Sequence, residues 1–129
     1  MSVQRKILAL QNLIRARPAY ANIPIVVVNG TPMTARELLA RLQRGEMVAE
    51  IVSALTRVGL DPQPEQYWQL AQAYYERLAR EAPTLRIVCL GRILSPAEAA
   101  EEIRKRTPVG QTLVQTYMKL LAEMGRLIR

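Results

Sequence analysis

Residues that commonly perform enzyme chemistry are scarce in this chain. The sequence contains no histidine and a single cysteine, Cys89. Without histidine, the chain cannot form a Ser-His-Asp triad or a Cys-His pair, and it has no imidazole for acid–base catalysis. One cysteine and no histidine also exclude the usual structural zinc sites, which need about four such ligands. These common catalytic and zinc-binding arrangements are therefore excluded.

Three carboxylates at the start of a predicted helix, Glu98, Glu101 and Glu102, are the remaining candidates for acid–base or metal chemistry. Glu98 and Glu102 share a helix face, but no third ligand type accompanies them, and the helix dipole alone favours acids at this position. Asn29-Gly30 and Leu90-Gly91 each precede a helix, yet one glycine is far short of a phosphate-binding fingerprint. We therefore predict a protein that is not an enzyme, with no catalytic residue, no metal site and no cofactor.

The charge of the chain indicates the kind of partner it has. Eighteen Lys and Arg residues outnumber eleven Asp and Glu residues, for a net charge of +7. Such an excess favours an anionic partner, either nucleic acid or an acidic protein. A single cysteine cannot form an internal disulfide, which is typical of a cytoplasmic protein. No stretch approaches the ~20 apolar residues of a membrane span, so we expect no membrane partner. Homo-oligomer formation is left open.

The chain contains an internal repeat at an offset of 61 residues. The segment from Ile23, IPIVVVNGTPMTARELLARL, is similar to the segment from Thr84, TLRIVCLGRILSPAEAAEEI. Each copy reads as helix, short apolar strand, glycine, capping box, helix, short turn and helix, and such ordered self-similarity indicates repeated units. We infer a tandem duplication with a first unit at residues 1–60 and a second at residues 61–129.

This pattern predicts a mainly α fold built of two α-β-α-α units. The two short apolar strands are expected at residues 25–28 and 85–90, and they either pair with each other or pack separately. Asn29-Gly30 is expected to lead into a helix rather than a second strand. The last helix is expected at residues 108–124, with Gly125 ending it.

The last predicted helix differs in surface chemistry from its counterpart in the first copy. Residues 104–129 hold six basic residues and one acidic residue, Glu123. The side chains at outward positions of this helix are amides, hydroxyls and one amine, namely Gln111, Thr112, Gln115, Thr116 and Lys119. Such groups can bind base edges and phosphates, although an ordinary solvated helix face has the same composition. The first copy has Glu46 and Glu50 instead, which a DNA backbone would repel.

The stretch LSPAEAAEEIRKRTPVGQTLVQTYMKLLAEMGRLIR resembles the second helix, turn, recognition helix and start of a wing strand of winged-helix or helix-turn-helix DNA-binding domains. The resemblance implies a winged-helix-like fold in which the five outward residues of the last helix face the major groove. It also implies that basic residues clamp the DNA backbone: Arg104, Lys105, Arg106, Arg126 and Arg129. This chain departs from the pattern in its longer turn between the two helices and in a wing that is missing or reduced to one strand.

Two functions remain open at the level of sequence. The first is a small basic nucleic-acid-binding protein that reads duplex DNA with its last helix, with residues 1–60 as a scaffold or dimerisation unit. The alternative is a protein-interaction or assembly subunit of a larger complex, whose duplicated surfaces contact acidic partner proteins.

Overall fold

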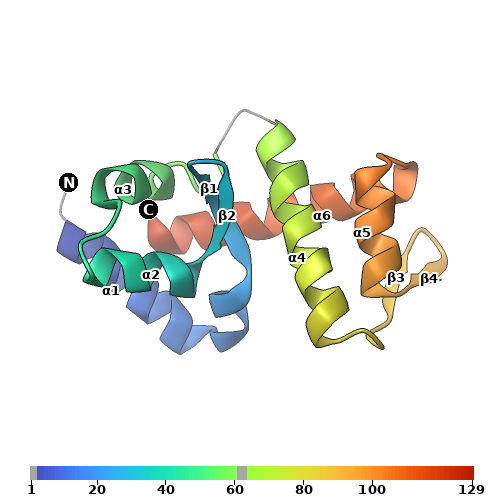
Figure 1. The fold of residues 1–129 in the computed structure, drawn as a ribbon, viewed down its shortest axis with the longest axis horizontal. Helices are drawn as coiled ribbons and strands as arrows, with labels where there is room; N and C mark the ends of the chain where they lie inside the picture. Colours follow the sequence, from blue (N-terminus) through green and yellow to red (C-terminus); the bar gives the residue numbers. More distant parts are fainter. Residues whose placement is uncertain (1–2, 61–63) are drawn as a thin grey trace. The chain divides into compact units, whose positions relative to one another are not determined.

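The computed structural model describes residues 3–60 and 64–129, and the described chain is mainly helical (Figure 1). The chain divides into two compact units. The first comprises residues 1–62 and 120–129, and the second comprises residues 63–119. The expected second unit, residues 61–129, therefore differs from the observed one, because the last ten residues group with the first unit.

The first unit contains three α-helices, a short 3₁₀ helix and a two-stranded sheet, and the last residues of the final helix also belong to it. In chain order the elements are α1 (Val3–Ala16), a 3₁₀ helix η1 (Pro18–Asn22), β1 (Pro24–Val28), β2 (Thr31–Thr34), α2 (Ala35–Gln43) and α3 (Val48–Leu55). Helix α1 packs on α2, and β1 packs on α3. The core consists of fully buried aliphatic side chains, among them Leu10, Ile25, Leu38, Ile51, Leu55 and Leu121.

The second unit has the same order of α-helices and strands, without a counterpart of η1 among its described residues. They are α4 (Pro64–Glu81), β3 (Ile87–Cys89), β4 (Arg92–Leu94), α5 (Pro96–Arg104) and α6 (Pro108–Ile128), of which residues 120–128 belong to the first unit. Helices α4 and α5 pack together, as α1 and α2 do in the first unit. Leu94, Ile103, Leu113 and Tyr117 are buried, and so is Cys89, as expected for a small apolar residue.

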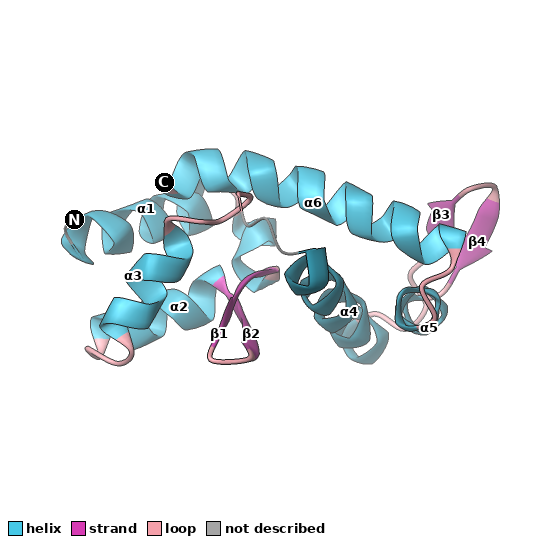
Figure 2. Cartoon of the chain, turned by 90° about the horizontal axis from the view of Figure 1, so that it is seen from above, coloured by secondary structure: helices cyan, strands magenta, loops and turns pink. Residues whose placement is uncertain are grey.

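Both predicted strands form, but each pairs with a second strand that the sequence analysis did not predict. The sheets are separate antiparallel hairpins, β1–β2 and β3–β4, so the two predicted strands do not pair with each other (Figure 2). The expectation that a helix directly follows Asn29-Gly30 is wrong. Both residues have positive φ, +49° and +79°, as a type I′ hairpin turn requires. Strands β2 and β4 are too short to show a clear alternating pattern.

A capping box starts the second helix of each unit, as predicted. Glu37 N donates to Thr34 Oγ1 at 3.2 Å, and Thr34 N donates to Glu37 Oε1 at 2.9 Å. Ser95 and Glu98 make the same reciprocal pair at 3.1 and 2.9 Å. These bonds satisfy two amides at each helix start and fix where α2 and α5 begin.

The last helix is longer than predicted. Gly125 does not end it, and residues 126–128 are helical, so the expected start of a wing strand is wrong. Gly125 serves another purpose, because a Cβ there would collide with the carbonyl oxygen of Val58. Likewise, a Cβ on Gly59 would lie 2.6 Å from Ala122 Cα. The two glycines let the end of α6 pack directly on the backbone that follows α3.

The two hairpin turns generate a stability prediction. Leu90 occupies the position equivalent to Asn29, with φ +50° and a side chain that is 61% exposed. A left-handed conformation costs about 1 kcal/mol for a bulky residue, whereas asparagine tolerates it. We therefore expect Leu90→Asn to raise the free energy of unfolding by about 1 kcal/mol, and Asn29→Leu to lower it by a similar amount. Urea denaturation measures both, and changes of the opposite sign would contradict the turn assignment.

Candidate nucleic-acid interface

The candidate interface is built on α5, a short turn and the start of α6. Helix α5 ends at Arg104 and α6 begins at Pro108, so three residues connect them. The expectation of a longer turn is therefore wrong, and the observed length is typical of helix-turn-helix motifs. Arg106 makes the tight reversal at φ +56°. In Figure 2, α5 is seen nearly end-on while α6 runs across the view, so the two helices cross steeply.

A close backbone contact holds the two helices at this crossing. A Cβ on Gly110 would collide with the carbonyl group of Glu102. Thr107 caps the start of α6, because its Oγ1 accepts from Gly110 N at 3.1 Å. The same hydroxyl lies 3.1 Å from Glu102 Oε1, to which it donates. The start of α6 is therefore positioned by the last turn of α5.

The outward face of α6 is the one that the sequence predicted. Gln111, Gln115, Thr116 and Lys119 are exposed, and Thr112 is half-buried. The opposite face buries Leu113, Val114 and Tyr117 against the second unit's core. The helix period of 3.6 residues accounts for this division.

The two threonines on this face already use their hydroxyl hydrogens. Thr112 Oγ1 donates to the carbonyl of Pro108 at 3.1 Å, and Thr116 Oγ1 donates to the carbonyl of Thr112 at 3.0 Å. They retain lone pairs and methyl groups for a ligand. The side-chain N–H donors on the face are those of Gln111, Gln115 and Lys119.

The basic residues next to this face lie in ion pairs. Arg104 makes a two-point contact with Glu101, in which Nε lies 2.9 Å from Oε2. Lys105 Nζ lies 3.4 Å from the same carboxylate. Arg106 Nη2 lies 2.6 Å from Glu65 Oε2 on α4. All these side chains are solvent-accessible, so the ion pairs stabilise the fold only weakly.

Arg106 also stacks on an aromatic ring, a contact that the sequence analysis missed. Its guanidinium carbon lies 4.6 Å from the ring centroid of Trp68, a half-buried residue of α4. Glu65 and Trp68 stand more than 35 residues before Arg106, and no local pattern connects them. Only the packing of α4 on α5 brings them together.

The three carboxylates considered for catalysis each have a structural partner. Glu98 completes the capping box, and Glu101 binds Arg104 and Lys105. Glu102 Oε1 accepts from Arg92 Nη1 at 2.9 Å and from Thr107 Oγ1. Within residues 3–60 and 64–129, no three acidic or cysteine side chains cluster in a way that could hold a metal ion.

Arg126 and Arg129 belong to the first unit, so the structure does not group them with the basic residues of the α5–α6 turn. Arg126 is exposed near the end of α6. Arg129 Nη1 donates to the carbonyl of Val58, a contact that holds the end of the chain to the first unit.

No family model matches this chain, and neither a curated protein nor a solved structure is significantly similar to it. Among the helices of the described residues, none combines the length and apolar character needed to cross a membrane.

The ion pairs around Glu101 generate a prediction about titration. Hydrogen bonds from Arg104, with help from Lys105, lower the pKa of Glu101 from 4.5 to about 2. The stabilisation from this pair is present above pH 4.5 and is lost as the pH falls towards 2. We expect Arg104→Ala to raise this pKa towards 4.5, because it removes the main hydrogen-bond donor.

Carbon-detected NMR of the glutamate side chains measures this pKa directly. Arg77→Ala, which removes a guanidinium from α4 that pairs with Glu81, is the matched control and should leave the pKa of Glu101 unchanged. A wild-type pKa for Glu101 between 4 and 5 would contradict the observed pairing.

Proposed function

We propose that this protein is a small, non-enzymatic protein that binds duplex DNA through α5, the three-residue turn and α6. The observation that carries this proposal is the exposed face of α6, on which Gln111, Gln115 and Lys119 present N–H donors and no carboxylate stands between them. This face follows directly on a turn of helix-turn-helix length.

The chemistry of this face suits the edges of base pairs. A glutamine amide can donate to and accept from adenine in the major groove, and a lysine amine binds guanine or phosphate. The methyl groups of Thr112 and Thr116 can contact the methyl groups of thymine. This contact leaves the two threonine hydroxyls free to keep their hydrogen bonds to backbone carbonyls of α6. A binding mode in which α6 enters the major groove would bring all of these groups to the bases.

The paired cations next to the turn would supply backbone contacts. Arg104, Lys105 and Arg106 lie at the end of α5 and are exposed. When DNA binds, its phosphates would take the place of the Glu101 and Glu65 carboxylates beside these three cations. The ion pairs would then join the protein to DNA, and the helices would not have to move. In this scheme the carboxylates hold the cations in place until DNA binds.

Of the resemblance to winged-helix domains, we propose the helix-turn-helix part alone. The β3–β4 hairpin precedes α5, and α6 continues to Ile128, so we propose a helix-turn-helix arrangement without a wing after the recognition helix. We also propose that the two units arose by duplication. The support is the shared order of elements, the matching capping boxes, and positive φ at Asn29-Gly30 and Leu90-Gly91, 61 residues apart.

A charge reversal on α6 tests the proposal. We expect Gln115→Glu combined with Lys119→Glu to weaken duplex DNA binding at least about tenfold near 100 mM salt, because two carboxylates would face the phosphates. Lys119→Gln alone should reduce the slope of log K against log salt by about one if Lys119 contacts a phosphate. Fluorescence anisotropy with labelled duplex DNA measures both effects.

Arg86→Glu provides the control, since Arg86 is an exposed cation of the same unit that lies outside α5 and α6. It lowers the net charge by two, against three for the α6 double variant, and leaves the α6 face intact. If Arg86→Glu weakens binding as much as the α6 changes do, or if the α6 variants bind like wild type, the proposed interface is wrong.

A second candidate function, an assembly subunit, is favoured by the outer face of the second hairpin. Val88 and Ile93 are cross-strand partners and are 74% and 62% exposed. Apolar pairs of this kind on a two-stranded sheet favour association. If the protein assembles through this face, light scattering should show an oligomer that Val88→Thr with Ile93→Thr dissociates. A monomeric wild type at tens of micromolar, with no change in the variant, would argue against self-assembly there.

A further inference from the structure

We propose that the first unit carries a docking groove for an acidic amphipathic helix of a partner protein. The groove lies between α1 and the end of α6, and its lining shares no residue with the outward face of α6. The inference is therefore independent of the proposed DNA binding. It rests on the shape, the apolar lining and the charge of this one surface.

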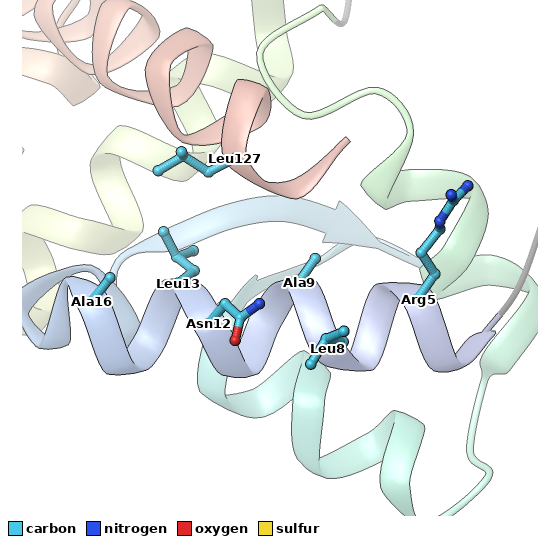
Figure 3. A pocket seen from close by; sticks show the side chains of 7 residues that line it. All are labelled: Arg5, Leu8, Ala9, Asn12, Leu13, Ala16 and Leu127. Carbon is cyan, nitrogen blue, oxygen red and sulfur yellow. The ribbon is translucent and has the colours of Figure 1, made fainter.

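The groove is an open apolar depression of about 330 Å³. Figure 3 shows Ala9 and Leu13 on the side of α1 towards Leu127 of α6, and Leu8 on the near side of α1; all four residues line the groove. Leu8 and Leu127 are large aliphatic side chains that remain 55% and 53% exposed. Exposed leucines on both sides of a concave surface are typical of a binding site rather than of scattered surface residues.

The α1 residues of the groove recur at helical spacing. Arg5, Leu8, Asn12 and Ala16 line it from the first to the last turn of α1. At 1.5 Å per residue, this distance is about 16 Å, which accommodates roughly three turns of a second helix. Alanine side chains within the lining would allow the partner helix to approach closely.

A buried lysine holds the two sides of the groove together. Lys6 is 3% exposed, and its Nζ donates to the carbonyl of Ile128 at 3.4 Å. This bond satisfies a carbonyl at the end of α6, where the helix dipole favours a positive charge. The close approach of Gly125 to Val58 fixes the same segment from the other side. Leu127 is therefore held opposite α1 in the absence of a partner.

The charge around the groove determines the class of partner. Of the residues that line it, Arg5 is charged and none is acidic. Helix α1 contains three cations, Arg5, Lys6 and Arg15, and no acidic residue. Arg15, exposed on α1, lies two turns after Leu8 on the same helix face. Glu123, one turn before Leu127 on α6, is exposed but does not line the groove.

An acidic amphipathic helix satisfies these features together. Its apolar face would cover Leu8 and Leu127, and its acidic flanks would pair with Arg5 and Arg15. A second copy of this groove would bring like charges together, and the phosphates of DNA would gain nothing from an apolar lining. A flat lipid surface would contact the exposed leucines but would not fill a concave site.

Synthetic peptides of about 18 residues, long enough to form a helix on binding, provide the test. One peptide carries leucines at i, i+3, i+4 and i+7 with glutamates elsewhere. A second has the same composition in scrambled order, and a third replaces every glutamate with lysine. With the full chain and fluorescence anisotropy, we expect the acidic amphipathic peptide to bind at least tenfold more tightly than either of the others.

Variants of the groove distinguish specific docking from general attraction. Two double variants should each weaken binding of the acidic amphipathic peptide about tenfold or more. The first is Leu8→Ala with Leu127→Ala, and the second is Arg5→Glu with Arg15→Glu. The matched controls are Leu60→Ala and Arg36→Glu, an exposed leucine and an exposed cation of the same unit that do not line the groove. Both controls should bind within about twofold of wild type.

Several results would overturn the inference. Equal binding of the scrambled peptide would show attraction to charge alone. No binding of the amphipathic peptide, or equal loss in the control variants, would show that the groove is not its site. Binding to phosphatidylserine vesicles that depends on Leu8 and Leu127, without peptide binding, would assign the surface to a membrane. Gln115→Glu with Lys119→Glu should leave peptide binding unchanged, so failure of either proposal can be recognised separately.

Discussion

The close approach of backbones at three glycines controls the position of α6, and both candidate surfaces depend on this helix. Gly110 brings the start of α6 against the carbonyl of Glu102, while Gly125 and Gly59 bring its end against the segment that follows α3. A side chain at any of these positions would move the helix outward. The contact of Gly110 with Glu102 fixes the direction in which α6, with its outward glutamines, runs from the α5–α6 turn. The other two place Leu127 at the groove of the first unit.

The two surfaces differ in chemistry because charge is distributed unevenly between the units. The first unit holds ten basic and five acidic residues, and the second holds eight and six. In the second unit the cations beside α6 are paired with carboxylates of α4 and α5, which leaves a polar face suited to hydrogen bonding. In the first unit, α1 carries its cations without acidic neighbours in sequence, and an apolar groove lies among them. One surface fits specific hydrogen bonding, and the other fits an acidic amphipathic partner.

The two units share an order of α-helices and strands but differ in their surfaces. The second helix of each unit begins with the same capping box, and each hairpin turns through two residues with positive φ. The helix after the short turn differs most. It ends at Leu55 in the first unit, whereas α6 continues to Ile128 and contributes its last turns to the other unit. Differences in helix length and in outward residues, rather than in the order of α-helices and strands, therefore separate the two units.

The sequence by itself determined the helix starts, the outward face of α6 and the absence of histidine chemistry, because these depend on local spacing, capping and composition. It did not show β2 or β4, since three- and four-residue strands have too little pattern to be recognised. Only the tertiary structure decided that Arg106 pairs with Glu65 and stacks on Trp68, and that residues 120–128 pack in the first unit. These contacts join residues far apart in sequence. They form only after the helices pack through their buried faces and through the glycines that let two backbones approach closely.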